Sequence, residues 1–520
     1  MILKNNKNIK IIILLGSFLV IGFFVAQWWA KNYIKDFLSN KTSSLFTVQY
    51  SDLELNLLQG TIVLYRPSVA IKDSVTSKNH TYLKLEKLQL KGIGYWDLLF
   101  NEKVSLRNLT LINPKINHYP YQRSKSEKDK EKQLEKSLKT ITIGELNLIN
   151  GDLNVMKNKA DSISISVSAY DLKALNLKIN LQTLATVPVV YKNFHVKAKN
   201  ILLNHSDYES FKIDSINTNK EEVVIKNLQL VPKYTKQELS KHLSKERDHM
   251  QLKIPELVLE KPDFNYANKR LGITAPSVKI TAPNLEIYRD KLVPDDLTIK
   301  PLYSKSLRKL DFNLNIRKTQ IKNGYISYAE LVEPDKSAGK IFFKNVNAVV
   351  NTISNLKDAK KTDIKINSRF MGVAPLELNW SFDVNNQADA LYVSGSVINL
   401  PASVLNPFFK PNLNVITEGT LQQMYFTFNG NNSKSSGTMK MKYDDFKFNI
   451  LRKKTSKINK FLTAIGNIFI KDGDKNTNVE GFRYGTIEAE RDPTKSFFNY
   501  LWINVKSGVI STLTGDGKKE

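Results

Sequence analysis

The chain has 520 residues, of which 41% are hydrophobic and 24% are charged, and it contains no cysteine. The absence of cysteine excludes disulfides, thiolate metal sites, cysteine nucleophiles and a lipoprotein anchor. An excess of 77 Lys and Arg over 50 Asp and Glu gives a formal net charge of +27. That charge is typical of proteins that bind nucleic acid, but the lysines are spread singly along polar strand faces. We therefore expect no nucleic-acid partner, and a lysine-rich strand surface that discourages edge pairing and attracts anionic lipid headgroups.

An apolar segment at residues 11–30 is the clearest feature near the N-terminus. A helix of this length spans about 30 Å, the thickness of the hydrocarbon part of a bilayer. A cleaved signal peptide is the alternative, but cleavage requires small residues at alternate positions, and Trp28 follows Ala26 at the second position. We expect an uncleaved single-pass anchor within residues 1–45, with a cytoplasmic N-terminus and a helical neck after the membrane. The predicted anchor side chains are Ile11, Leu14, Phe18, Phe23, Trp28 and Trp29.

Residues 46–122 alternate between apolar and polar residues, which is typical of β-strands. In the segment from Val104 onward, Leu106 and Leu109 both occupy apolar positions, so one extra residue separates them and predicts a β-bulge. The dipeptide Asn113–Pro114 predicts the end of that strand's ladder, because proline has no N–H to donate.

The middle of the chain repeats this pattern. A charged run at residues 123–139 predicts a solvated helix or a mobile insertion. Alternating strands then occupy residues 140–456, with a charged helical insertion at residues 233–251. Leu228, Leu257 and Leu285 follow one another at intervals of 29 and 28 residues. This imperfect period predicts either stacked β-units or an ordinary large antiparallel β protein.

The C-terminal region at residues 457–520 has a helical rather than an alternating pattern, and a strand is expected between its helices. Residues 458–470 are predicted to be helical, and Asp492–Pro493 is a plausible N-cap and first turn of a second helix. This second helix is either packed against the last strands or in contact with a second membrane or a partner. Its predicted apolar stripe contains Phe498, Leu501, Trp502, Val505 and Val509.

No group of residues has the spacing of a catalytic or metal site. The histidines are scattered, and Ser306-Leu-Arg-Lys309 lacks the partner motifs of the acyl enzymes that share its spacing. We therefore expect a protein that is not an enzyme and that needs neither a metal nor a cofactor.

Several phrases of the sequence resemble a known family when they are taken together. In chain order they are Gly60–Ile71, Leu83–Leu90, Tyr95–Phe100, Val104–Ile116 and Glu488–Trp502. This order is similar to that of AsmA-like proteins (the AsmA, TamB and DUF748 group) of Gram-negative bacteria, and the last phrase is similar to a Bacteroidetes branch. The resemblance implies an inner-membrane anchor and a periplasmic, elongated and strongly curved antiparallel β-groove, shaped like a taco, that conducts phospholipids toward the outer membrane. It supplies no catalytic motif.

The leading hypothesis is therefore an anchored periplasmic groove that binds phospholipid acyl chains and conducts lipids between the inner and outer membranes. Its C-terminus is expected to reach the outer membrane or an outer-membrane partner. The alternatives are a periplasmic scaffold or assembly factor for outer-membrane proteins, which pairs with the edges of client strands, and an envelope spacer. The residues predicted to line the groove are Leu83, Leu85, Leu106, Leu109, Leu111, Leu146, Leu148, Leu228, Leu230, Leu257, Leu259, Phe312 and Leu314.

Overall fold

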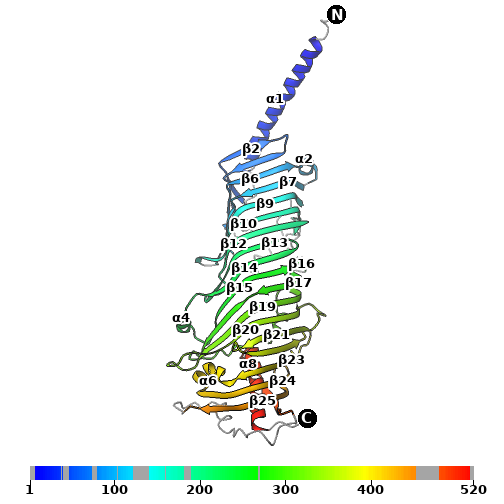
Figure 1. The fold of residues 1–520 in the computed structure, drawn as a ribbon. Helices are drawn as coiled ribbons and strands as arrows, with labels where there is room; N and C mark the ends of the chain where they lie inside the picture. The colour runs from blue at the N-terminus through cyan, green and yellow to red at the C-terminus, as the bar shows by residue number, and fades with distance from the viewer. Residues whose placement is uncertain are drawn as a thin grey trace. The chain divides into compact units, whose positions relative to one another are not determined.

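A computed structural model shows a mainly β protein whose strands form one large mixed sheet (Figure 1). The chain divides into two compact units, the first made of Met1–His205 and Ile213–Lys220 and the second of Ser206–Lys212 and Glu221–Glu520. The predicted insertion at 123–139 and the predicted helix at 458–470 lie outside the described residues. The structure describes residues 6–36, 38, 46–72, 79–101, 103–120, 140–157, 160–180, 189–267, 270–451 and 480–515.

The first unit begins with a helix, as the sequence predicts, and continues with short strands and then with two long ones, β9 and β10. Its helices are α1 (Asn6–Asp36) and α2 (Tyr95–Phe100). Its strands are β1 (Phe46–Gln49), β2 (Asp52–Asn56), β3 (Thr61–Tyr65), β4 (Ser68–Lys72), β5 (Asn79–Lys84), β6 (Lys87–Ile93), β7 (Lys103–Ile112), β8 (Lys115–His118), β9 (Thr140–Lys157), β10 (Ala160–Asn180), β11 (Val189–Val190) and β12 (Asn193–Leu203). Strand β13 (Glu209–Thr218) has residues in both units.

The second unit adds further strands and more helices. Its helices are α4 (Lys236–Lys241), α5 (Tyr303–Arg308), the 3₁₀ helix η4 (Ala402–Leu405), α6 (Asn406–Leu413) and α8 (Phe497–Thr514). Its strands are β14 (Glu222–Pro232), β15 (His249–Glu260), β16 (Asp263–Ala267), β17 (Arg270–Thr281), β18 (Asn284–Asp290), β19 (Asn313–Leu331), β20 (Gly339–Ser354), β21 (Thr362–Phe370), β22 (Ala374–Phe382), β23 (Leu391–Pro401), β24 (Val415–Gly430), β25 (Lys434–Ile450) and β26 (Arg483–Glu490).

Strands β7 and β8 are two arms of one bent strand. Between them Asn113 adopts a left-handed backbone with φ of 50°, and both arms pair in parallel with β9. Across the corner, the N–H of Asn113 donates to the carbonyl of Ile149 at 2.9 Å, and the N–H of Asp152 donates to the carbonyl of Pro114 at 2.7 Å. The prediction that the ladder stops at Asn113–Pro114 is confirmed for β7, whose pairing with β9 ends at Ile112, but the continuation in β8 was not predicted. Proline ends β7, but the strand turns a corner and pairing resumes.

The same corner recurs in neighbouring strands and in both units. A left-handed residue is followed by proline or glycine. Asparagine, which occupies three of these left-handed positions, tolerates positive φ, and proline has no N–H that needs an acceptor at the bend. A hydrogen bond joins two neighbouring corners: the side-chain amide of Asn150 donates to Asn113 Oδ1 at 2.9 Å. The corners of this type are Arg66–Pro67, Asn113–Pro114, Asn150–Gly151, Lys261–Pro262, Ala282–Pro283 and Asn323–Gly324.

The distortion between Leu106 and Leu109 is shared by neighbouring strands. Arg107 of β7 lies at the same level as Gly92 on β6 and Gly144 on β9, as the register partners on either side of it show. Gly92 has φ of 66°, and a Cβ at that position would lie 2.5 Å from the Arg107 Cβ. The prediction that Leu106 and Leu109 share one face is confirmed, since both belong to one apolar cluster. The predicted β-bulge is not present, because the register between β7 and its neighbours β6 and β9 has no shift. The three strands deviate together instead.

The sheet is mixed, so the predicted antiparallel sheet is wrong in this respect. Strand β9 runs parallel to β7 and β8, and β19 runs parallel to β17 and β18. Each parallel pair follows a long connection, residues 119–139 and residues 291–312. Long connections let the chain return to the starting end of the sheet before the next strand begins.

Two helices of the second unit begin with side-chain caps. In α4 a capping box joins Thr235 to Glu238, and Leu239 is buried, so a short helix is present within the predicted insertion at 233–251, although β15 already begins at His249. Helix α8 begins at Phe497, and its N-cap is Ser496 rather than Asp492, which corrects the predicted start. The Asp492 carboxylate instead accepts hydrogen bonds from the backbone and hydroxyl of Thr494, which forms a turn before the helix.

Candidate functional site

Apolar side chains form rows that cross the strands of the first unit in register. On one arm of the bent sheet, neighbouring partners from β3 to β12 are Leu64, Leu88, Leu111, Leu148, Leu172 and Val196. On the other arm, partners from β1 to β10 are Val48, Val69, Leu83, Ile116, Leu153 and Val167. Paired residues point to the same side of a sheet, so each row is continuous.

Both rows lie on the inside of the bend. At the β9 corner Ile149 and Asn150 are exposed, whereas Gly151 is buried. Leu148 lies directly before this exposed pair. Leu153 is two residues after the buried Gly151 and therefore points to the same side of the strand as Gly151. We call the side of the sheet that carries these rows the inner face.

Taken by itself, the second unit also has an inner face, defined in the same way. Its corner at Asn323–Gly324 repeats the pattern, with Asn323 exposed and Gly324 buried. One row of register partners crosses from β14 to β22 and ends among the strands near the C-terminus. It consists of Ile225, Leu257, Ile280, Ile321, Ala348, Ile366 and Leu378, and then Gly395, Phe426 and Met439.

Burial along this row changes abruptly after β22. In β21 and β22 Ile366 and Leu378 are only half-buried, and the polar residues between them on the outer face are exposed. In β23 to β26 the residues of the inner face become buried. Val393, Phe428 and Ile487 are 0% exposed. They belong to the largest core cluster, to which α8, α6, η4 and the residue before α5 also contribute. The inner face is therefore less covered from β14 to β22 than beyond it, and Leu376, Leu378 and Trp380 of β22 form the border, because they already pack against this cluster.

The predicted groove residues lie on strands of both units. Leu85 and Leu106 are buried, and the others are half-buried. The structure brings Leu106, Leu109 and Leu146 into one cluster and Leu257, Leu259 and Leu314 into another. Leu228 and Leu230 lie opposite Ile254 and Leu252, whereas Phe312 precedes β19 and has no register partner among the described residues.

Sequence reasoning missed much of the inner face on later strands. Strand β22 was recognisable from the alternation in Leu376-Glu-Leu-Asn-Trp380, but alternation alone does not tell which row faces the inside of a bend. The missed half-buried residues are Ile225, Ile280, Ile321, Ile364, Ile366, Leu376, Leu378 and Trp380.

The predicted anchor residues belong to α1. Phe23 is half-buried, Trp28 and Trp29 are 67% and 63% exposed, and the side chains of Ile11, Leu14 and Phe18 lie outside the described residues. Where side chains are described, no helix combines the length and the apolar character that a membrane crossing requires.

Helix α8 packs through a different face from the predicted stripe. Its buried positions include Tyr500, Asn504, Gly508 and Thr512. Of the predicted stripe, Leu501, Val505 and Val509 are only partly buried, and Phe498 and Trp502 are 61% and 41% exposed. Small side chains let the helix approach the strands closely, which is why the contact face is less apolar than the stripe beside it.

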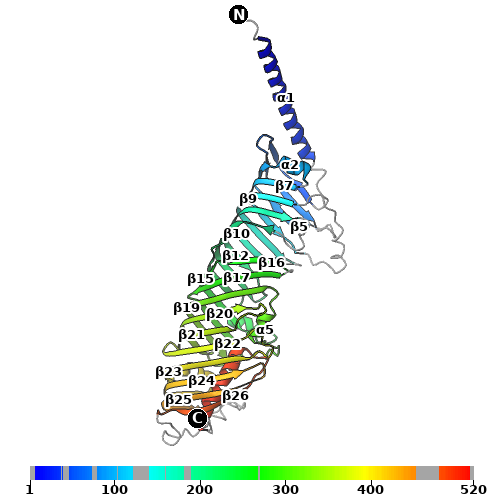
Figure 2. The same ribbon diagram turned by 90° about the vertical axis from the view of Figure 1, so that its right-hand side faces the viewer.

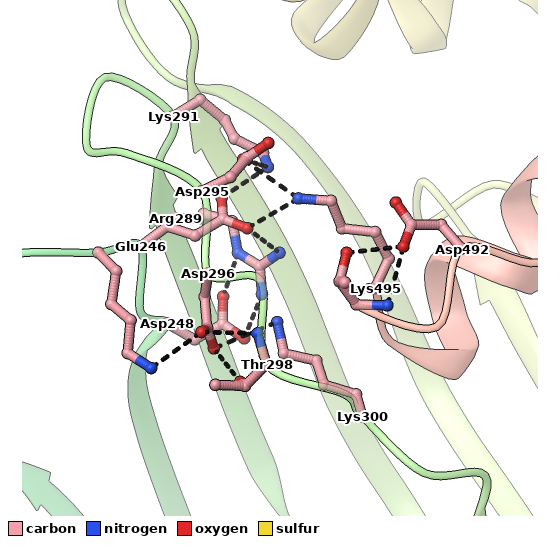
Figure 3. Close-up of polar contacts among 12 residues, drawn as sticks. Glu246, Asp248, Arg289, Lys291, Asp295, Asp296, Thr298, Lys300, Asp492 and Lys495 are labelled. Carbon is pink, nitrogen blue, oxygen red and sulfur yellow. Dashed lines mark hydrogen bonds and ion pairs between the residues drawn. The ribbon is translucent and has the colours of Figure 1, made fainter.

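A group of charged side chains anchors the segment that precedes α8 (Figure 3). The Glu246 carboxylate is 1% exposed and accepts hydrogen bonds from Lys291 Nζ at 2.7 Å and Lys495 Nζ at 3.1 Å. Lys495 also pairs with Asp295 at 3.1 Å. Burial opposes ionisation of Glu246, but the contacts with Lys291 and Lys495 outweigh it and hold the pKa of Glu246 below its ordinary value. Burial lowers the pKa of Lys495, but the hydrogen bonds to Asp295 and Glu246 outweigh burial and raise this pKa above its ordinary value.

The substitution Glu246→Gln is expected to lower the free energy of unfolding by about 2 kcal/mol at neutral pH, because it removes the buried carboxylate that two partly buried lysines share and leaves them only Asp295. The depressed pKa means that this stabilisation is present above the ordinary pKa of about 4.3 and is lost as the pH falls through the folded-state value. The difference between the native protein and the variant should therefore shrink below about pH 4, as measured by urea denaturation.

The matched control is Glu256→Gln, which removes an exposed ion pair with Lys226. An exposed pair contributes little, so a loss below about 0.5 kcal/mol is expected. Equal losses for the two variants, or an acid-independent loss at Glu246, would contradict a buried ionised carboxylate.

Within the described residues, no group of three or more His, Asp or Glu side chains is placed to hold a metal ion. A search of protein-family models found none that matches the chain, and a search of curated proteins found no matching relative. The resemblance to AsmA-like proteins therefore stays a prediction.

Proposed function

We propose that the inner face binds the acyl chains of phospholipids and that the protein conducts lipids between the inner and outer membranes of a Gram-negative envelope. The observation that carries this proposal is the row from Ile225 to Leu378, which is continuous in register yet mostly half-buried. Acyl chains on such a surface gain about 0.8 kcal/mol per buried CH₂. Because the row lacks polar interruptions other than backbone, a bound chain could slide from strand to strand without a high barrier.

The inner face in this proposal is an open groove between the two arms of the bent strands. The corners supply the bend, and the alternation of half-buried Ile366 with exposed Lys365 and Asn367 supplies one apolar and one polar side. Lysines on the polar side would favour anionic headgroups at the groove edge.

The proposed location is the periplasm, with α1 as an inner-membrane anchor and the N-terminus in the cytoplasm. Exposed apolar side chains along α1 support this, since Val20, Ile21, Phe24 and Val25 are 55% to 62% exposed. Exposed Phe498 and Trp502 on α8 support a contact with the outer membrane or a partner there.

Native mass spectrometry of protein purified in mild detergent tests the proposal. We expect phospholipid to co-purify with the full chain, because the transfer of acyl chains from water to half-buried apolar rows is favourable. A purified Ile366→Asp variant is expected to retain at least tenfold less lipid. A co-purifying polypeptide in place of lipid would instead support the assembly-factor alternative, and a chain free of both would support the spacer.

A further inference from the structure

The inner face of the second unit ends inside the chain. Helix α8 packs against β24, β25 and β26, as Figure 2 shows near the C-terminus. Its residues Phe497, Tyr500 and Leu513 share one core cluster with Phe426 and Met439, which continue the row of Ile366 and Leu378. The helix thus covers the surface that a lipid would otherwise reach by sliding past β22.

An aromatic contact marks the boundary between the half-buried and covered parts. The ring of Phe497, the first residue of α8, stacks on Trp380 with ring centroids 4.1 Å apart and an interplanar angle of 12°. Tyr303 of α5 meets both rings edge-on at 5.1 and 5.8 Å. Trp380 itself belongs to the inner face, so Phe497 occupies the place where an apolar chain could lie against it.

The fit between α8 and the last strands is close. A Cβ at Gly508 would lie 2.7 Å from Met439 Cε and 2.9 Å from Ile487 Cγ1, and one at Gly485 would lie 2.6 Å from the backbone nitrogen of Thr512. These distances leave no space for an acyl chain between helix and sheet. The contact between α8 and the last strands therefore excludes a lipid chain.

The charged group before the helix fixes its start. Lys495 binds Glu246 and Asp295, and the N–H of Lys300 donates to the carbonyl of Pro493 at 2.8 Å. Together with the Trp380 stack, these contacts hold Phe497 in place from two sides.

We propose that α8 is an end stop for the lipid-binding face, with Phe497 on Trp380 as its boundary. This inference rests on the proposed function. Lipid chains would occupy the inner face from β14 to β22 and would be excluded from β23 to β26. Cargo would therefore leave this unit across the open side of the bent sheet and not past β26.

A phosphatidylethanolamine with a diazirine in its acyl chain tests the boundary. The full chain is loaded with this lipid, irradiated and digested, and the adducts are mapped by mass spectrometry. Peptides of β15, β19 and β21 are expected to carry adducts, and peptides of β23 to β26 at least tenfold fewer. Equal labelling of both groups overturns the end stop and leaves the proposed function standing. Absence of adducts from every inner-face strand overturns both.

The variant Gly508→Leu tests whether α8 is what excludes lipid chains from β23 to β26. Its side chain would push the helix off Met439 and Ile487, and adducts on β24 and β25 should rise at least fivefold. The control Asn499→Leu changes an exposed residue of the same helix and should leave the map unchanged. Unchanged labelling in a folded Gly508→Leu variant counts against the end stop. If that variant fails to fold, the adduct map of the unmodified protein still tests whether lipid is excluded from β23 to β26.

Discussion

Phospholipid transfer between donor and acceptor vesicles is expected to fall at least tenfold in the variants Leu230→Asp, Leu259→Asp and Ile366→Asp. Each substitution places a carboxylate on the inner face, at a half-buried position of β14, β15 or β21. A carboxylate keeps its water and does not form the contacts that an acyl chain gains from leucine or isoleucine, so a chain sliding along the row would meet a barrier there. The fold should survive, because these side chains already touch solvent and can keep a charge hydrated.

The control for this prediction is Asn367→Asp, which adds the same charge to the exposed outer face of β21 next to Ile366. It should transfer lipid at the rate of the unmodified protein. Circular dichroism and thermal unfolding verify that all four variants are folded. Folded Leu230→Asp and Leu259→Asp variants with full transfer activity would refute the groove, and loss of activity in Asn367→Asp would point to a general effect of charge.

Alternation predicted the strands because it depends only on which side of a strand each residue faces. It could not predict the corners. The positive φ of Asn113 and Asn150 arises from neighbouring strands that bend at the same level, and this information lies far away in the sequence. For the same reason the sequence predicted the end of β7 at Asn113–Pro114 but not the corner that leads into β8 and its renewed pairing with β9.

The predicted groove residues of the early strands lie together in the fold, whereas many residues of the inner face on later strands were not predicted. Leu106, Leu109 and Leu146 were identified from their repeated phrase, and the register places them together. The face of α8 was mistaken because the most apolar stripe is not the one that packs. Gly508 and Thr512 bring the helix onto β26, a fit that depends on the shape of the strands and has no signature in hydrophobic periodicity.

The strand-edge alternative gains no support from the C-terminal edge of the sheet. Within the described residues, β26 pairs only with β25. Its other side is partly occupied by α8, because Ser507 Oγ both donates to the Glu488 carbonyl and accepts from its N–H, and Ser511 Oγ accepts from the Thr486 N–H. An edge whose polar groups are already satisfied offers little to a client strand.

The contrast between an open and a closed part of the inner face also predicts a difference in stability. Leu421→Ala is expected to cost about 3 kcal/mol, because Leu421 is 4% exposed within the largest core cluster and its removal leaves a cavity. Leu257→Ala makes the same chemical change at a half-buried position of β15 and should cost only about 1 kcal/mol, since part of the side chain already lies in contact with solvent.

Urea denaturation followed by tryptophan fluorescence measures both costs from the shift of the midpoint at constant slope. The comparison is matched, because the deleted atoms are identical and both leucines belong to the second unit. Bound lipid must first be removed with detergent, since a ligand on the inner face would stabilise the native state and mask the smaller effect. An equal cost at the two positions would mean that β15 is as enclosed as the C-terminal core. The inner face would then have no apolar surface left for a lipid, whatever its register.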